Sequence, residues 1–435
     1  MSPRTLTASL AALLAASAAP ALAQGLGTSW AVTNAHLVIG DGSAPIDHGT
    51  VVVRAGKVVA AGAGIAVPAD LPVIDAQGKW VTPGLVVAVT DLGLVDVGAV
   101  DESNDADAAK SPFSAALDIA PAINPAAQPI AVSRAAGVTR AAVAPLSTAA
   151  IFEGQGAVID LGADPHAVTA ARAFQYIELG EGGAQLAGGS RISAVAELRN
   201  ALGEARELAA APAAPRRDDV LLTRSDAAAL VPVVTGRQPL YIHVERAADI
   251  RMALALKAEF AAIKLVIVGA SEGWMVAGEL AAAGVPVLAT PLTDLPASFE
   301  KLGATQSNVG RMAKAGVKVA LGAFFDQPRY APQYAGNLVA LSRVPGATGL
   351  SWDKAFAAIS SGPAEAMGMG GQLGSLRAGR AGDVVIWDGD PLELQTGVVR
   401  VFIDGVEQPL SNHQTRLRDR YATPTEGALP KAYDW

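Results

Sequence analysis

Few residues of this chain carry side chains suited to metal or acid–base chemistry. The chain has 435 residues, five of which are histidine, and it has no cysteine. Thiolate metal ligands, cysteine nucleophiles and disulfides are therefore excluded. The five histidines are His36, His48, His166, His243 and His413. A site built from four histidines would need nearly all of them at one place in the fold.

His243 is the histidine best placed for catalysis. It follows Tyr241 and Ile242 at the end of a short apolar run that we expect to be a strand. An imidazole there suits a general base, and a nearby carboxylate would orient it and raise its pKa. We predict Asp91 and Glu245 as its catalytic partners. Two alternatives stay open. His243 could be hydrogen-bonded to a neighbour and have no catalytic role, and the two acids could cap a helix or lie in solvated loops.

Four acids follow the expected strands and suggest a second kind of site. Asp91, Glu245, Glu272 and Asp326 each come just after an apolar run. Carboxylate oxygens are the ligands that Mg²⁺ and Ca²⁺ prefer. The alternative is four separate acids on the rim of the fold, and whether Glu272 and Asp326 bind a hard cation stays open.

The pattern of apolar residues predicts how these side chains are positioned. Residues 24–84 and 371–421 read as short strands with tight turns, whereas residues 85–370 alternate strand-like and helix-period segments. Such alternation predicts parallel strands with crossover helices, and its length suits a closed barrel. We therefore predict an α/β fold, a TIM-like (β/α)8 barrel over 85–370 with a composite β-sandwich built from both termini. Residues 422–435 read as a loose tail.

Several elements inside the barrel region are predicted individually. Strands are expected at residues 138–144, 239–244, 264–269 and 317–322, a long helix at 192–211 and a closing helix at 352–367. The Gly154-Gln155-Gly156 segment is expected to turn near the mouth of the barrel.

Composition and motifs exclude several functions. Hydrophobic residues make up 51% of the chain and charged residues 17%, which favours a packed core over disorder. The formal net charge is −8, and without a basic face we expect no nucleic-acid partner. The chain has no Gly-x-Ser-x-Gly motif and no strand–GxGxxG–helix order, so neither an esterase-type serine triad nor a dinucleotide site is supported.

The first 23 residues predict export. A positive start is followed by an apolar run over residues 6–19 and by Ala21-Leu22-Ala23, which has the small-x-small pattern of a cleavage site. We expect a signal peptide cleaved after Ala23, a periplasmic or secreted protein, and no membrane attachment after cleavage.

Motifs at both ends of the predicted barrel resemble those of the amidohydrolase superfamily. Thr82-Pro83-Gly84-Leu85, with its lead-in over residues 74–81, is similar to that family's entry into the first barrel strand. Residues 374–385 and 361–365 are similar to its return into the small β domain and to the helix after the last strand. The chain resembles the exported, imidazolonepropionase-like branch. The resemblance implies a TIM barrel, a composite β-sandwich, and zinc-dependent or other divalent-metal-dependent hydrolysis of non-peptide C–N bonds.

The positions that the resemblance marks as metal ligands are mostly replaced. Val89 and Asp91 stand for the two histidines of strand one, Gly269 for the histidine of strand six, and Phe324 for the aspartate after strand eight. Strand five keeps His243, and we identify no convincing Lys or Glu at the end of strand four. We therefore expect a degraded metal site with no bound zinc, and no cofactor.

Three functions stay open, and whether the chain is an enzyme stays open with them. The first is an amidohydrolase-like hydrolase of C–N bonds with an altered site. The second is a catalytically silent small-molecule-binding protein, a pseudoenzyme on the same fold. The third is a metal-free acid–base enzyme that uses His243 with Asp91 or Glu245. In each case the expected partner is a small molecule at the barrel mouth, while its identity and the oligomeric state are not predicted.

Overall fold

The computed structural model describes residues 27–423 except 147, 148, 216 and 326. The predicted signal segment, the predicted tail from residue 424 onward, and Asp326 lie outside the described residues.

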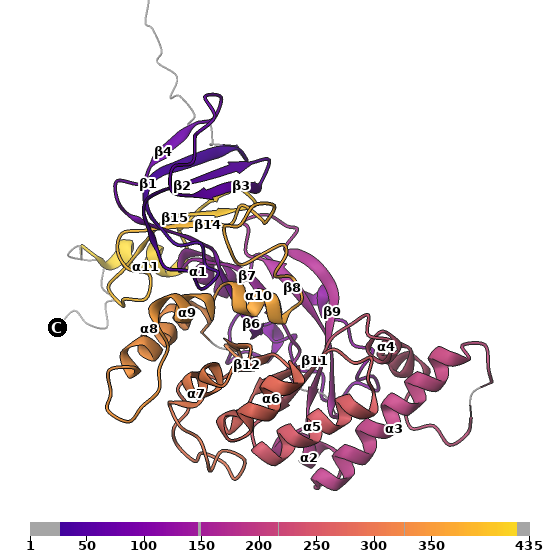
Figure 1. The fold of residues 1–435 in the computed structure, drawn as a ribbon. Coiled ribbons are helices and arrows are strands. Elements are labelled where there is room, and N and C mark those ends of the chain that lie inside the picture. Colours follow the sequence, from indigo (N-terminus) through magenta and orange to yellow (C-terminus); the bar gives the residue numbers. More distant parts are fainter. Residues whose placement is uncertain (1–26, 147–148, 216, 326, 424–435) are drawn as a thin grey trace, which may run out of the picture.

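Strands from the two ends of the chain form one sheet, drawn in indigo and yellow in Figure 1. The strand order is β16-β15-β14-β5-β1-β2-β3, with β4 paired to β1. Its strands are β1 (Trp30–Leu37), β2 (Ile46–Arg54), β3 (Lys57–Gly62), β4 (Val73–Asp75), β5 (Trp80–Pro83), β14 (Val384–Trp387), β15 (Val398–Ile403) and β16 (Val406–Gln408).

The pairing of β5 with β14 joins the two termini within this sheet. Val384 pairs with Pro83, and the indole N–H of Trp387 donates to the Thr82 hydroxyl at 2.9 Å. Trp30 is fully buried beside Phe402, with ring centroids 4.3 Å apart. Apolar side chains from both ends of the chain thus share one core, which neither end could build alone.

A second sheet of eight strands forms a nearly closed barrel. Neighbouring strands follow one another in chain order, and an isolated parallel bridge between Ala88 and Gly322 joins the first strand to the end of the last. The strands are β6 (Leu85–Thr90), β7 (Val138–Val143), β8 (Phe152–Asp160), β9 (Val168–Glu178), β10 (Leu240–Val244), β11 (Leu265–Gly269), β12 (Val287–Ala289) and β13 (Val319–Leu321).

The barrel departs from the predicted (β/α)8 pattern at β8. This strand is antiparallel to both β7 and β9, whereas the other adjacent pairs are parallel. The connections on either side of β8 are short, and a short connection forces antiparallel pairing because a parallel crossover needs a dozen or more residues. β7, β8 and β9 therefore form a meander inside an otherwise parallel barrel.

The expected turn at Gly154-Gln155-Gly156 is wrong, because these residues lie inside β8. A Cβ atom at Gly156 would stand 2.1 Å from the Phe174 ring on β9, and one at Gly154 would stand 2.9 Å from the Leu117 carbonyl. The two glycines are therefore needed in β8 because a larger residue at either position would collide with Phe174 or Leu117.

Most helices lie on the outside of the barrel, whereas α11 lies beside α1, near the terminal sheet (Figure 1). They are α1 (Gln128–Ala135), α2 (Glu181–Leu186), α3 (Arg191–Ala210), α4 (Arg224–Val234), α5 (Ala247–Glu259), α6 (Ala277–Ala283), α7 (Asn308–Lys314), α8 (Ala331–Leu341), α9 (Trp352–Ala357), α10 (Ser361–Ala366) and α11 (His413–Tyr421). In the described part of the chain, no helix combines the length and apolarity that crossing a membrane requires.

The longest helix, α3, follows from local sequence signals. The Ser190 side chain accepts a hydrogen bond from the Ile192 N–H and begins the helix. Leu198, Leu202 and Ala205 form its buried stripe. The expected helix over 192–211 agrees with this element within one residue at each end. The expected single closing helix over 352–367 is instead two helices, α9 and α10.

The barrel interior is packed with apolar side chains. Phe174 on β9 stacks on Tyr241 on β10, with centroids 4.2 Å apart. Ala364 and Met367 belong to the same buried cluster, so α10 and the residue after it cover one end of the barrel. The opposite end, where β9 and β10 finish, carries polar groups.

Arg140 on β7 joins the barrel to the terminal sheet. Its guanidinium is buried and binds both carboxylate oxygens of Asp383, at 2.7 and 2.9 Å, and the Asp404 carboxylate at 2.8 Å. Burial by itself would lower the pKa of Arg140, but the two carboxylates outweigh it and raise that pKa above its ordinary value.

Candidate functional site

The mouth cluster consists of Glu178, His243, Glu245 and Lys301. Glu178 is the last residue of β9, and His243 lies at the adjacent position of β10, because the two residues pair in the sheet. Both lie at the C-terminal end of parallel strands, the end of such a barrel where active sites are built. The strand expected over 239–244 is confirmed within one residue as β10, with His243 one position before its end.

Glu178 holds one nitrogen of the imidazole. The Nδ1 of His243 lies 2.5 Å from Glu178 Oε2, while Glu178 Oε1 accepts a hydrogen bond from the Gly180 N–H at 2.9 Å. Sequence analysis identified no Lys or Glu at the end of strand four, and the structure places Glu178 there. The alternation of Phe174, Tyr176 and Glu178 along β9 is the signal that could have identified this residue.

Glu245 holds the other nitrogen. The Nε2 of His243 lies 3.2 Å from Glu245 Oε1, so the two residues predicted two positions apart do meet. The side chain of Glu245 is only 2% exposed, and its Oε2 accepts the Ser271 N–H at 2.7 Å. The next residue, Arg246, binds Asp249 at 2.8 Å and not Glu245.

Lys301 completes the cluster from the segment between β12 and α7. Its ammonium lies 3.2 Å from Glu245 Oε1, and its side chain is 27% exposed. Sequence reasoning missed Lys301, because a lysine in a long connection carries no periodic signal.

Arg191 at the start of α3 ties this segment to the barrel. It binds Asp249 on α5 at 2.9 Å and Glu300 at 3.3 Å. The Glu300 carboxylate also accepts the Glu181 N–H at 2.7 Å. Burial raises the pKa of Glu300, partly offset by that hydrogen bond. Glu300, the residue before Lys301, is thus anchored to both α2 and α3.

The electrostatics of the cluster favour a protonated His243. Burial by itself would lower the pKa of His243, but Glu178 and Glu245 outweigh it and raise the pKa to about 10. Burial would raise the pKa of Glu245, but His243, Lys301 and the Ser271 hydrogen bond lower it to about 2. At neutral pH the imidazolium therefore donates one N–H to each carboxylate, and it has no lone pair with which to accept a proton.

The other predicted acids lie in different surroundings. Asp91 follows β6, and its carbonyl accepts the N–H groups of Leu94 and Val95 in a turn. The carboxylate of Glu272 is buried and accepts the N–H groups of Ala247 and Gly303, at 2.9 and 2.8 Å. Glu272 is thus a backbone anchor. The catalytic roles of Asp91, His243 and Glu245 stay predictions.

The remaining histidines are positioned away from the mouth. His166 lies in the turn between β8 and β9, at the opposite end of the barrel from Glu178. His36 on β1 binds Asp47 at 2.6 Å, and His48 on β2 binds Asn34 at 3.1 Å. His413 is the first residue of α11.

The donor set of the mouth cluster does not fit a catalytic zinc ion. Zinc prefers two or three nitrogen or sulfur ligands in such sites. Here both nitrogens of the single imidazole are hydrogen-bonded to carboxylates, and the ammonium of Lys301 forms an ion pair with Glu245. Within the part of the chain that the structure describes, no three His, Cys, Asp or Glu side chains are grouped as a metal ion requires.

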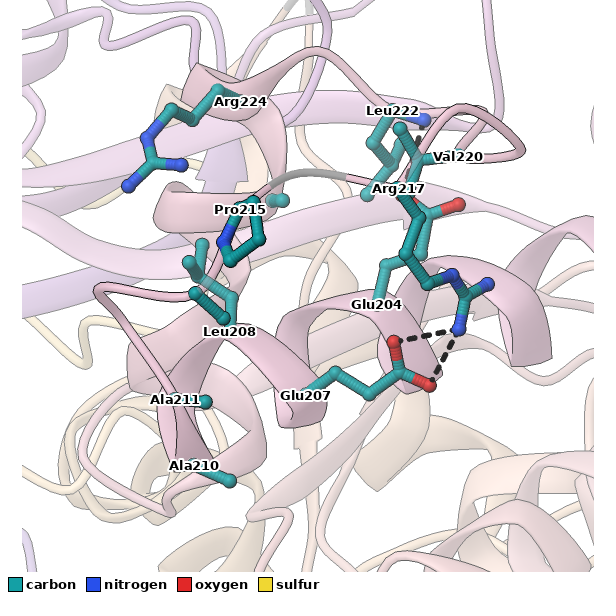
Figure 2. A pocket seen from close by; sticks show the side chains of 12 residues that line it. Glu204, Glu207, Leu208, Ala210, Ala211, Pro215, Arg217, Val220, Leu222 and Arg224 are labelled. Atoms are coloured by element: carbon teal, nitrogen blue, oxygen red, sulfur yellow. Dashed lines mark hydrogen bonds and ion pairs between the residues drawn. The ribbon is translucent and has the colours of Figure 1, made fainter.

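An apolar pocket of about 410 Å³ lies away from these residues, at the C-terminal end of α3 (Figure 2). Leu208, Pro215 and Leu222 line it, and the ion pair between Glu207 and Arg217 lies along it. No residue of the mouth cluster lines this pocket.

Comparison with known proteins points to one superfamily. Residues 196–407 match the sequence model of the Amidohydrolase family. The amidohydrolase tasK of Hapsidospora irregularis is 43% identical over 60 residues, which are 14% of this chain and 6% of that protein. The matched segment is thus a small part of this relative.

Solved structures share the fold over most of the chain. An amidohydrolase from Thermotoga maritima MSB8 is 25% identical, with a TM-score of 0.76 over 87% of this chain and 98% of its own. Molinate hydrolase is 18% identical, with a TM-score of 0.53 over 92% of this chain and 97% of its own. Phenylurea hydrolase B is 14% identical, with a TM-score of 0.52 over 92% of this chain and all of its own. The last two show likeness of fold alone.

Proposed function

Since the family match and the structural neighbours support the amidohydrolase superfamily, we propose that this chain is a catalytically silent member that binds a small polar molecule at the barrel mouth. The observation that carries the proposal is the position of His243 between Glu178 and Glu245. An imidazolium held by two carboxylates neither ligates a metal nor accepts a proton, so it serves neither metal-dependent nor general-base hydrolysis.

The proposed ligand carries both hydrogen-bond donors and acceptors. The side chains of Glu178 and His243 are 20% and 22% exposed, and that of Lys301 is 27% exposed. The accessible part of the cluster therefore offers a carboxylate, from Glu178, and an ammonium group, from Lys301. Amides and other small molecules with a donor next to an acceptor complement this pair of charges.

The competing proposal is hydrolysis of a non-peptide C–N bond. It is favoured by neighbours that include molinate hydrolase and phenylurea hydrolase B. Metal-free acid–base catalysis through His243 with Asp91 or Glu245 is a third candidate. It requires His243 to release a proton, which a pKa of about 10 disfavours at neutral pH.

Elemental analysis of dialysed protein, paired with a hydrolysis assay, tests the proposal. We expect no stoichiometric zinc and no hydrolysis of amide, carbamate or urea substrates, with or without added Zn²⁺. One zinc per chain, lost together with activity in His243→Ala, would establish the hydrolase instead.

Binding is tested separately with a panel of small amides, using calorimetry. Lys301→Met should weaken any binding to the wild-type chain, while Lys314→Met, an exposed lysine at the end of α7, should not. If both variants bind like the wild type, the mouth cluster is not the binding site.

Export also remains a proposal of the sequence. Amino-terminal sequencing of protein from the producing cell should give Gln24 as the first residue, and an intact Met1 or Ser2 would contradict it.

A further inference from the structure

A cavity of about 540 Å³ lies beside the barrel, separate from the mouth cluster. It is bounded by α3, by the start of β8 and α4, and by the segment before α1. No residue of the mouth cluster lines it.

The charge on these walls is negative only. Glu197 and Asp226 line the cavity, and among the described residues no Lys, Arg or His does so. Asp226 is buried, and its carboxylate accepts the N–H groups of Ser114 and Ala116, at 3.0 and 2.8 Å, and the Thr223 hydroxyl at 2.5 Å. Asp226 therefore holds the wall together and adds to its negative potential.

Glu197 differs from Asp226 because its carboxylate has no partner. Within the described part of the chain, no hydrogen bond or ion pair holds it, although the side chain is half-buried on α3. Burial raises the pKa of Glu197 above its ordinary value. A half-buried carboxylate without a counter-ion is costly, and a bound cation removes that cost.

The other walls suit an organic cation. Phe113 is 44% exposed and lines the cavity, and Ser193 and Asn200 lie on the wall with Glu197. The Asn200 amide N–H donates to Glu204, which leaves its carbonyl oxygen as an acceptor. An aromatic face attracts an ammonium group through the negative charge of its π-system, and amides and hydroxyls accept hydrogen bonds from N–H donors.

We propose that this cavity binds a small organic cation, an amine or a methylated ammonium, with Glu197 as its counter-ion and Phe113 as its aromatic contact. The volume is within the range of small-molecule sites. The inference is independent of the proposed function at the mouth, because the two sites share no residue.

Titration of the full chain with tetramethylammonium and with ethylammonium, followed by calorimetry, tests the proposal. We expect saturable binding of at least one of them and no saturable binding of 3,3-dimethylbutanol, a neutral molecule of similar bulk. Glu197→Gln should weaken binding by about tenfold, the loss of one charge-assisted contact. Phe113→Ala should weaken it by roughly threefold or more, the range of an exposed cation–π contact.

Glu207→Gln is the matched control, because Glu207 also lies on α3 but is paired with Arg217 and lines the pocket of Figure 2, not the proposed cavity. Its affinity for the probe should equal that of the wild-type chain. Phe113→Ala alters an exposed side chain and provides an independent readout should Glu197→Gln fail to fold. Two results would overturn the proposal. One is a titration with KCl that gives the same heat of binding as tetramethylammonium. The other is an unchanged affinity for the probe in both Phe113→Ala and folded Glu197→Gln.

Discussion

The carboxylate of Glu245 occupies the space that a side chain at Gly269 would need. A Cβ atom at residue 269 would stand 2.9 Å from both Glu245 Cδ and Oε1, and 3.0 Å from Oε2. The backbone of Gly269 also has a φ of +89°, which L side chains rarely adopt. The glycine at the end of β11 and the carboxylate beside His243 therefore depend on each other.

Gly269→Ala should lower the free energy of unfolding by roughly 3 kcal/mol, because strain at positive φ adds to displacement of a buried carboxylate. Chemical denaturation measures this value. Gly284→Ala is the matched control, since Gly284 has a φ of +62° and a Cβ atom there would meet nothing within 4 Å; it should cost only about 1 kcal/mol. If the two variants lose equal stability, Glu245 is not displaced.

His243 should make the protein less stable at alkaline pH. Its pKa is raised from 6.5 to about 10, so the folded chain binds this proton more tightly than the unfolded chain. The resulting stabilisation is fully present below pH 6.5 and is lost as the pH rises through about 10. Denaturation across this window should show a decline that is shallower in His243→Gln. The charged groups around the imidazole are Glu178, Glu245, Glu300 and Lys301, and all four are present in both proteins.

Glu245 should act at the opposite end of the pH range. Its pKa is lowered from 4.5 to about 2, so its stabilisation is present above pH 4.5 and is lost as the pH falls through about 2. Lys301→Met removes one of the charges that lower this pKa and should bring the acid-induced loss to a higher pH. Acid denaturation followed by circular dichroism measures the midpoint, with Lys314→Met as control. An unchanged midpoint would show that Lys301 does not act on Glu245.

Arg140→Met should destabilise the whole chain by about 3–5 kcal/mol, because it leaves Asp383 buried without its cation. Arg54→Met removes an exposed pair with Asp70 and should change stability far less than Arg140→Met does. Thermal unfolding of both variants gives the comparison. A loss in Arg140→Met no larger than that in Arg54→Met would mean that the junction between barrel and terminal sheet does not depend on this ion pair.

Local patterns predicted much of the fold. The apolar run ending at His243 and the stripe on α3 each satisfy a strand or helix period within a short segment, so their elements could be assigned from neighbouring residues alone. The β8 region could not, because Gly154 and Gly156 are typical of turns and only the close approach of Phe174 makes them suitable for a strand.

Only part of the candidate site could be predicted from the sequence. His243 and Glu245 are two positions apart, so strand alternation was enough to suggest that they meet. Glu178 lies 65 positions before His243, and Lys301 comes from the connection after β12. No local pattern links such residues, and the error at β8 also hid the strand that ends at Glu178.

The sequence by itself determined which chemical groups the chain possesses: five histidines, no cysteine, and no side-chain ligand at Val89, Gly269 or Phe324. The tertiary structure alone decided what the remaining groups do to one another. Closing the barrel brings Glu178, Glu245 and Lys301 around one imidazole, away from most of the solvent. Because interactions between charges depend on distance and burial, the protonation of His243 follows from that arrangement and not from the order of residues in the chain.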